Sequence, residues 1–203
     1  MPVALVKPSV TQEALQAFGR RRDSLVTKIT QEKNALQKTD NVIVMRDIKS
    51  SIKELETRLL RIDKEIDKLV TGDKEFNSKR QQIESIKGIG RVSANTILIE
   101  LPETGNLTDG QASALVGVAP FPQNSGKHKG KRLTRGGRAR LRRGLFMGAQ
   151  SASRVNHVLS EFYNRLRNKG KRHRVTVIAV MRKLVCLINK MLGDSEFKLS
   201  EPS

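Results

Sequence analysis

The residues best suited to covalent chemistry lie in a basic, glycine-rich segment. Ser125 stands in the run Asn124-Ser125-Gly126-Lys127, where the following glycine leaves the serine hydroxyl accessible. Cations follow at short intervals and could neutralise a phosphate under nucleophilic attack: Lys127, Lys129, Lys131 and Arg132. On residue chemistry alone, a serine before a glycine is more often an ordinary turn residue. The only nearby general base is His128, so catalysis by Ser125 is the less favoured interpretation at this point.

Metal-dependent cleavage of DNA has other requirements, which this sequence does not meet. Such chemistry needs several carboxylates that converge on divalent cations. Between Gly110 and Gly193 the only acid is Glu161, and most other acids alternate with lysines on helix faces. The single cysteine, Cys186, excludes an intrachain disulfide and a CxxC metal site. The histidines lack the spacing of metal ligands: His128, His157 and His173. We therefore expect no cofactor in this chain.

Positive charge is concentrated in the C-terminal half of the chain. The net charge is +19, and from Gly110 to Gly193 there are 19 Lys and Arg residues against one acid. This excess indicates a polyanionic partner, either nucleic acid or an acidic membrane surface. One Tyr, no Trp and six Phe leave few rings for stacking unpaired bases, which favours contacts with duplex phosphates. No signal peptide or membrane span is evident, so we expect no membrane partner and a cytoplasmic location.

Two long helices must precede this basic region. A capping box at Ser9 and Gln12 starts the first helix, whose apolar residues recur at a 3/4 spacing: Leu15, Phe18, Leu25, Ile29 and Leu36. After a polar break at residues 39–41, the same spacing continues without a miss: Met45, Ile48, Ile52, Leu55, Leu59, Ile62, Ile66 and Leu69. We predict a coiled-coil helical hairpin over residues 1–72 that dimerises. A monomeric intramolecular hairpin is the slightly less favoured alternative.

A second glycine motif follows a short helix that is predicted from Asp73. The run Ile86-Lys87-Gly88-Ile89-Gly90-Arg91, with a helix after it, resembles a helix-hairpin-helix. Gly88 and Gly90 would allow a tight turn that exposes backbone N–H groups to a DNA phosphate, beside the cations Lys87 and Arg91. An ordinary glycine-rich connection between helices is the less favoured alternative.

The remaining segments complete a mainly α fold. Helices are predicted from Thr108 to near Gly117, from Arg138 to Arg154, from Val155 to near Gly170, and from Val175 to Leu192. Residues 123–137 should form an irregular loop or small hairpin, which includes the further candidate Arg135. The boundaries are 1–72 for the coiled-coil hairpin, 73–193 for a basic helical domain with the helix-hairpin-helix-like motif, and 194–203 for a flexible tail.

The second of these helices begins with an unusual cluster of arginines. Arg138, Arg140, Arg142 and Arg143 lie in its first turns, where the helix dipole favours acids instead. We therefore expect a bound polyanion to offset their repulsion, which makes all four candidates for nucleic-acid binding.

Several of these motifs together match a known family. The segments are Ile86 to Gly90, Leu101 to Glu103, Ala114 to Phe121, Ser125 to Lys127, Gly137-Arg138, Arg142-Arg143 and Met181 to Leu184. In this order they closely resemble the C-terminal domain of the insertion sequence one-ten (also called one-sixteen or nine-oh-two) transposases. The resemblance spans roughly residues 73 to 192, and the coiled coil lies where that family has one.

The resemblance carries expectations about activity. It implies that Ser125 is the catalytic serine, which attacks DNA to form a phosphoserine link in transposition. It also implies an N-terminal RuvC-like domain with a DEDD carboxylate set that holds divalent metal, Mg²⁺. Since this chain begins at the coiled coil, we expect that domain to be missing and the chain alone to be inactive. The expected partners are double-stranded DNA at element ends, an element-encoded structured RNA and further copies of the chain, within a bacterial cytoplasm at the nucleoid.

Two other functions remain open from the sequence. The chain could be a non-catalytic truncated transposase that acts as an oligomerisation or regulatory module. It could also be a general basic RNA-binding protein, which would show no preference for element ends.

Overall fold

The computed structural model describes residues 9–121, 124–125, 128–129, 133–134, 136–194 and 197, without the side chains of residues 120–135. This part of the chain contains eight helices and four two-residue strands, which confirms the mainly α prediction. The chain forms two compact units, Met1–Lys74 and Glu75–Ser203, called unit 1 and unit 2 below. None of the described helices has an apolar stretch long enough to cross a membrane.

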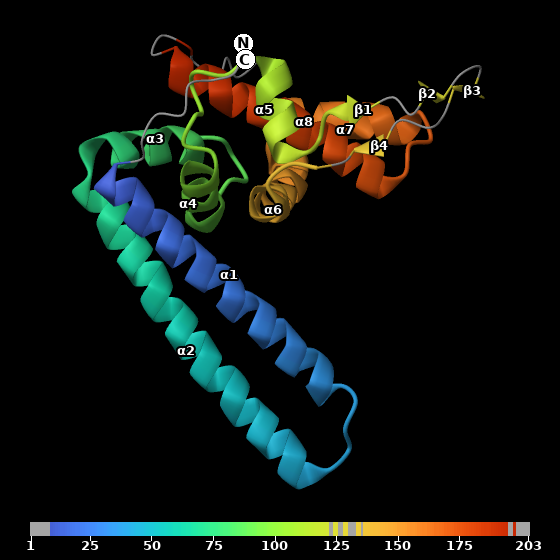
Figure 1. Ribbon diagram of the computed structural model, residues 1–203. Coiled ribbons are helices and arrows are strands. Elements are labelled where there is room, and N and C mark those ends of the chain that lie inside the picture. The colour runs from blue at the N-terminus through green and yellow to red at the C-terminus, as the bar shows by residue number, and fades with distance from the viewer. Residues whose placement is uncertain are drawn as a thin grey trace. The chain divides into compact units, whose positions relative to one another are not determined.

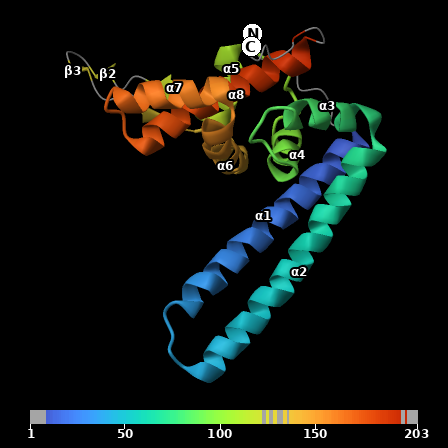
Figure 2. The same cartoon turned by 180° about the vertical axis from the view of Figure 1, so that it is seen from behind.

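Unit 1 is an antiparallel pair of long helices, α1 (Val10–Leu36) and α2 (Val42–Gly72), which lie side by side in both views (Figures 1 and 2). Ser9 caps α1 because its side chain accepts a hydrogen bond from the backbone N–H of Gln12, as the sequence predicts. Asn41 caps α2 in the same way, accepting from Ile43 and Val44. The polar break at residues 39–41 is therefore the end of one helix and the capped start of the next.

The predicted apolar stripes lie on the inner faces of this hairpin. Leu15, Leu25 and Ile29 of α1 are buried, as are Ile48 and Ile66 of α2, and the other stripe residues are half-buried. Arg22, which occupies a polar slot of the first stripe, donates to Asp63 of α2 at 2.7 Å. An ion pair across the hairpin thus occupies the place where an apolar residue is missing.

The described part of unit 2 contains six helices, of which α8 (His173–Gly193) is the central one. The others are α3 (Lys74–Glu84), α4 (Arg91–Glu100), α5 (Asp109–Val116), α6 (Ala139–Val155) and α7 (His157–Asn168). Helix α8 packs against α5, α6 and α7, and its buried residues include Val177, Met181, Leu184 and Ile188. The apolar run that the sequence marks as a core helix therefore does form the centre of unit 2.

Small residues let α4 and α6 cross closely. Gly144, Gly148 and Ala152 recur on one face of α6 at helical spacing. A Cβ atom on Gly144 would lie 2.7 Å from Thr96 Cγ2, and one on Gly148 would lie 2.9 Å from Ile89 Cδ1. A Cβ atom on Gly88 would lie 2.5 Å from the Cα atom of Ala152. The glycine-containing turn before α4 is therefore packed directly on the backbone of α6.

One helix boundary differs from the sequence prediction. Val155 is the last residue of α6 and is exposed, whereas its place in the apolar pattern assigned it to the next helix. The reason is the cap: the side chain of Asn156 accepts from the backbone N–H of Leu159, so α7 begins at His157. The apolar spacing therefore continues across the break between α6 and α7, and the Asn156 side chain sets the position of that break.

Alanine substitutions at Gly88 and Gly90 should show which glycine of the turn is required by close packing against α6. Gly88 has a φ of +97° and no room for a Cβ atom, so Gly88→Ala should destabilise unit 2 by roughly 2–4 kcal/mol. Gly90 has a φ of −92° and no atom within 4 Å of such a Cβ atom, so Gly90→Ala should cost less than about 1 kcal/mol. Urea unfolding followed by circular dichroism measures both; equal effects would contradict the packing assigned to Gly88.

Candidate nucleic-acid interface

The segment that carries Ser125 is held at its base by two glycines. Gly117 ends α5 with a φ of +75°, and Gly137 precedes α6 with a φ of +74°. A Cβ atom on Gly117 would lie 2.1 Å from the carbonyl oxygen of Gly136, so the two ends of the segment touch through their backbones. The backbone N–H of Arg138 also donates to the carbonyl of Leu115 at 2.7 Å. This closure fixes where the segment leaves unit 2 and returns to it.

Beyond this base, the backbone forms two successive antiparallel strand pairs. Strand β1 (Pro120–Phe121) pairs with β4 (Leu133–Thr134), and β2 (Asn124–Ser125) pairs with β3 (His128–Lys129). The register of the second pair places Ser125 opposite His128. We call residues 118–137 the arm. The sequence predicted either an irregular loop or a small hairpin here, and the strand pairings of the arm are those of a small hairpin.

The side chains of most predicted site residues on the arm are not part of the description. Ser125 and Lys129 are described through their backbones alone. The other predicted cations of the arm lie outside the described residues: Lys127, Lys131, Arg132 and Arg135. The nucleophile and the phosphate contacts assigned to these residues therefore stay predictions.

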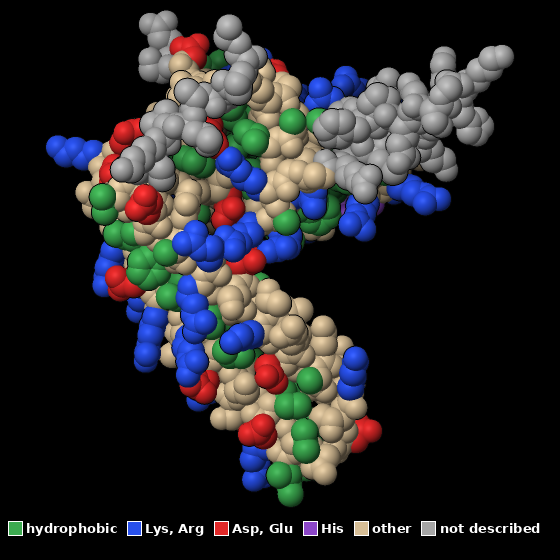
Figure 3. All heavy atoms as spheres, in the orientation of Figure 1, with side chains coloured by type: hydrophobic (Ala, Val, Ile, Leu, Met, Phe, Trp, Pro, Cys, Tyr) green, Lys and Arg blue, Asp and Glu red, His purple; other side chains and the backbone are tan. Residues whose placement is uncertain are grey.

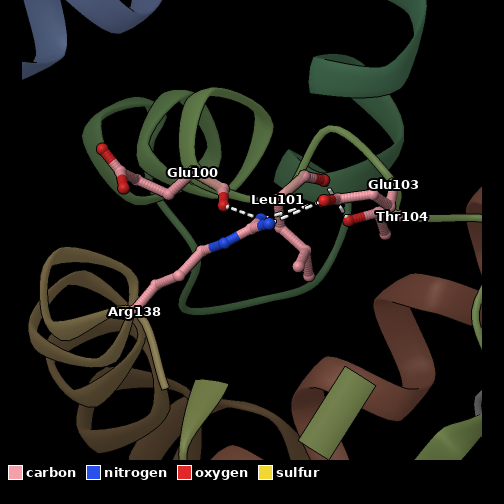
Figure 4. Close-up of polar contacts among 5 residues, drawn as sticks. All are labelled: Glu100, Leu101, Glu103, Thr104 and Arg138. Carbon is pink, nitrogen blue, oxygen red and sulfur yellow. Dashed lines mark hydrogen bonds and ion pairs between the residues drawn. The ribbon is translucent and has the colours of Figure 1, made fainter. Parts of the chain in front are cut away.

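Arg138, at the start of α6, is held by carboxylates of its own unit (Figure 4). Its guanidinium forms a two-pronged pair with Glu103, at 2.8 Å from Nη1 and 2.6 Å from Nη2. Nη1 also donates to the backbone carbonyl of Glu100. Both side chains are largely shielded, with 34% and 26% of the arginine and glutamate surfaces exposed. The pair joins the start of α6 to the loop that follows α4.

The Arg138 pair shifts both ionisations. The hydrogen bonds from Arg138 lower the pKa of the Glu103 carboxyl, against an opposing effect of burial. The same hydrogen bonds raise the pKa of Arg138 above its ordinary value. Both groups are therefore charged at neutral pH, and the arginine's charge is matched within the protein.

For two of the four arginines of α6, carboxylates of the chain supply the negative charge that the prediction assigned to a bound polyanion. Glu103 neutralises Arg138, and Glu100 pairs with Arg140 at 3.3 Å. Both acids precede the basic stretch in sequence. The fold brings Glu103 and Glu100 next to arginines that lie 35 and 40 residues further along the chain. Arg138 is thus a structural clamp, and the sequence alone missed its partners. The one available signal was two glutamates spaced three apart at the end of a predicted helix.

The other two arginines of this cluster differ in exposure. Arg142 is half-buried, and its Nη1 donates to the carbonyl of Gly136 at 2.6 Å, which ties α6 to the base of the arm. Arg143 is exposed. Of the four arginines predicted to contact nucleic acid, Arg143 is the one whose side chain reaches into solvent.

The loop that supplies Glu103 is itself anchored by α8. The Asn189 side chain accepts from the backbone N–H of Gly105 at 2.9 Å and donates to the carbonyl of Leu107 at 2.6 Å. Gly105 has a φ of +102°, and a Cβ atom there would lie 2.9 Å from the carbonyl of Leu192. A buried amide and a glycine contact thus fix the loop, so Glu103 is presented to Arg138 from a rigid support.

The glycine turn before α4 is exposed at Gly90. Gly90 is the N-cap of α4 and provides no side-chain cap. Lys87 and Arg91 on either side of it are also exposed. The chain forms a helix, a tight glycine turn and a second helix here, with cations at the positive end of the second helix. Binding of a phosphate at this turn stays a prediction.

No group of three or more His, Cys, Asp or Glu side chains that could hold a metal ion occurs among the described residues. The carboxylates near the arm are engaged with arginines, as shown above for Glu100 and Glu103.

Comparison with known proteins gives a consistent result. Residues 80–164 match the family model described as "Transposase IS116/IS110/IS902 family". The chain is 24% identical over 157 residues to the "Insertion element IS110 uncharacterized 43.6 kDa protein" of Streptomyces coelicolor, covering 76% of this chain and 38% of that protein. It is 24% identical over 177 residues to the "Pilin gene-inverting protein" of Moraxella bovis, covering 85% of this chain and 55% of that protein.

A shorter match is closer in sequence. The "Insertion element IS900 uncharacterized 42 kDa protein" of Mycobacterium paratuberculosis is 34% identical over 84 residues, which cover 40% of this chain and 21% of that protein. The matches thus span only about a fifth to just over half of the length of these three relatives.

Removal of the Glu103 charge should reveal the clamp through its pH dependence. Glu103→Gln should lower the free energy of unfolding by about 1–3 kcal/mol at neutral pH, because it leaves a partly buried arginine with a weaker partner. Since folding lowers the pKa of Glu103, its contribution is complete above the ordinary carboxyl pKa and disappears as the pH falls through the lower, folded value. The difference from wild type should therefore shrink towards acidic pH.

Chemical denaturation from pH 7 down to pH 3 measures this difference. Glu161→Gln serves as the control, because Glu161 is exposed and lies 3.6 Å from the imidazole of His157. A gap between wild type and Glu103→Gln that stays constant with pH would show that the carboxylate charge does not support the fold.

Proposed function

We propose that this chain, whose residues 80–164 match the model of the IS116/IS110/IS902 transposase family, belongs to that family and acts on DNA in transposition or a related recombination reaction. The observation that carries the proposal is the arm, which is clamped at Gly117 and Gly137 and holds Ser125 in a short strand pair. The relative named as a pilin gene-inverting protein places DNA inversion among the reactions of similar proteins.

We propose that Ser125 is the nucleophile. Its oxygen would form a bond to a backbone phosphorus while the bond from that phosphorus to one strand oxygen breaks. The serine proton passes to a base, and the released strand end takes up a proton. The result is a phosphoserine link that conserves the energy of the phosphodiester for rejoining. His128, the register partner of Ser125, is a candidate for the base.

Double-stranded DNA is the proposed substrate, held through its phosphates. The exposed cations beside the glycine turn and on α6 support this assignment, namely Lys87, Arg91 and Arg143. The backbone of Gly88 and Gly90 would supply hydrogen-bond donors at the same place. We propose that sequence choice comes from a structured RNA of the element, and that any catalytic Mg²⁺ is held by carboxylates of a RuvC-like domain.

Loss of Ser125 should remove a covalent adduct while leaving the fold and DNA affinity nearly unchanged. Ser125→Ala deletes only the nucleophilic oxygen, and a turn serine contributes within roughly half a kcal/mol to stability. The assay incubates labelled element-end DNA with the chain, alone and together with the remainder of a full-length relative, and examines denaturing gels for protein joined to DNA.

Ser151→Ala is the matched control, since Ser151 is an exposed serine on α6. The adduct should persist in this variant. An adduct that forms without Ser125 would remove that residue from the mechanism. If the wild-type chain joined to the relative's remainder gives none, the proposal of serine catalysis fails.

We also propose that the hairpin of unit 1 joins copies of the chain. Leu55, Leu59 and Ile62 of α2 are only half-buried within the hairpin, so a second copy could complete their burial. Sedimentation velocity across a range of concentrations should show a dimer or larger species for the wild-type chain. A monomer throughout would contradict this and favour the intramolecular hairpin.

A further inference from the structure

The junction of α7 and α8 carries a dense cluster of cations that the predicted interface does not include. Six basic side chains lie within ten residues there, and all are exposed: Arg165, Arg167, Lys169, Lys171, Arg172 and Arg174. We call these six residues the α7–α8 patch. Figure 3 shows Lys and Arg side chains around the end of unit 2 where these helices are joined.

The charge of this patch has no partner among the described residues. The sequence from Phe162 to Gly193 contains no acid, and no carboxylate in the described chain lies within ion-pair distance of the six side chains. The nearest acid by sequence is Glu161, which lies 3.6 Å from the imidazole of His157. The contrast with Arg138, whose charge is matched by Glu103, is direct.

Helix stability accounts for the position of only some of these cations. Arg165 and Arg167 lie in the last turn of α7, where the helix dipole favours positive charge. Arg172 and Arg174 lie at the start of α8, where the dipole disfavours it and where the first turn holds no acid. The second group therefore costs the isolated chain free energy that a bound anion would offset.

Local contacts give the patch a defined shape. Gly170 has a φ of +74°, which lets the chain reverse between the helices, and Arg167 Nη1 donates to the carbonyl of Lys171 at 2.6 Å. Arg165 of α7 and Lys183 of α8 both lie over the ring of Phe162, 5.4 and 5.1 Å from its centre. Two like charges thus meet at one aromatic ring, on adjacent helices.

We propose that the α7–α8 patch binds the phosphate backbone of a nucleic-acid double helix, at a second contact site of unit 2. Unpaired bases find little to stack on here, because Tyr163 is bonded to His173 and the Phe162 ring faces two cations. An acidic membrane would need apolar side chains to insert, and Val175 is the only large apolar residue exposed on the described parts of α7 and α8. Phosphate contacts of a duplex fit the remaining chemistry.

This inference rests on the proposed function only in that the chain binds nucleic acid. It adds a surface formed by residues that follow the matched region, since residues 165–174 lie beyond residue 164. A duplex held at two places is fixed in orientation as well as in position, whereas one contact leaves it free to pivot.

The test removes charge from the patch and from a matched surface. The patch variant is Lys171→Gln, Arg172→Gln and Arg174→Gln. The control is Lys28→Gln, Lys49→Gln and Lys64→Gln, three exposed residues of unit 1. Both variants of the full chain lose three positive charges. Fluorescence anisotropy from 50 to 200 mM KCl follows binding of a DNA duplex and of an RNA duplex of the same sequence.

In the patch variant, the affinity for DNA should depend less steeply on salt. The magnitude of the slope of log affinity against log salt should fall by about 2–3, because each lost phosphate contact reduces it by about 0.9. The control should change it by far less. A loss confined to the DNA duplex or to the RNA duplex would identify which helix the patch holds. A loss in both would show that it reads the shared backbone. If the patch variant unfolds, Arg165→Gln, Arg167→Gln and Lys169→Gln test the same surface.

A third variant, Lys87→Gln with Arg143→Gln, separates the two proposals. If it lowers the slope while both patch variants behave like the control, the patch inference is wrong and the proposed interface stands. A wild-type chain that binds neither duplex would overturn the nucleic-acid function itself. Binding of anionic lipid vesicles that depends on the patch, with duplex binding unchanged, would also overturn the inference.

Discussion

The close crossing of α4 and α6 is the constraint on which the rest of unit 2 depends. At Gly144, Gly148 and Ala152 the backbone of α6 lies so near to α4 and its preceding turn that no larger side chain fits. The same two helices are also joined by an ion pair near this crossing, since Arg140 of α6 pairs with Glu100 of α4. The crossing also places the glycine turn and the base of the arm on one scaffold, since Gly88 rests on α6 and Gly137 precedes it. A fold with few large aromatic residues gains its rigidity from close approach of backbones.

The cations of unit 2 divide into arginines held between its elements and cations exposed at its surface. Arg138 and Arg140 are paired with glutamates that come from another segment, so their role is to hold elements together. Cations at the glycine turn, at Arg143 and at the junction of α7 and α8 face solvent. A high net charge alone does not distinguish these two classes. Exposed cations are the ones placed to neutralise the phosphates of a bound polyanion and so release its counterions.

Helices with a continuous apolar period could be predicted from the sequence, and so could their caps at Ser9 and Thr108. Local chemistry sets these features, because a cap and a repeat involve residues within one or two turns. The partners of Arg138 could not be predicted, since Glu103 is 35 residues away and the pair depends on how α4 and α6 cross. The boundary at Val155 was wrong for a similar reason, because the Asn156 cap overrides the apolar pattern. Ser125 was selected as a candidate from its neighbours in sequence, whereas the strand register that sets it opposite His128 required the fold.

The contact between Gly117 and Gly137 means that the arm leaves and re-enters the protein at one point. A segment closed in this way is mechanically separate from the helices beneath it. Residues can be added to it or removed from it without moving either anchor, and doubling its length would cost only about 0.6 kcal/mol in closure entropy.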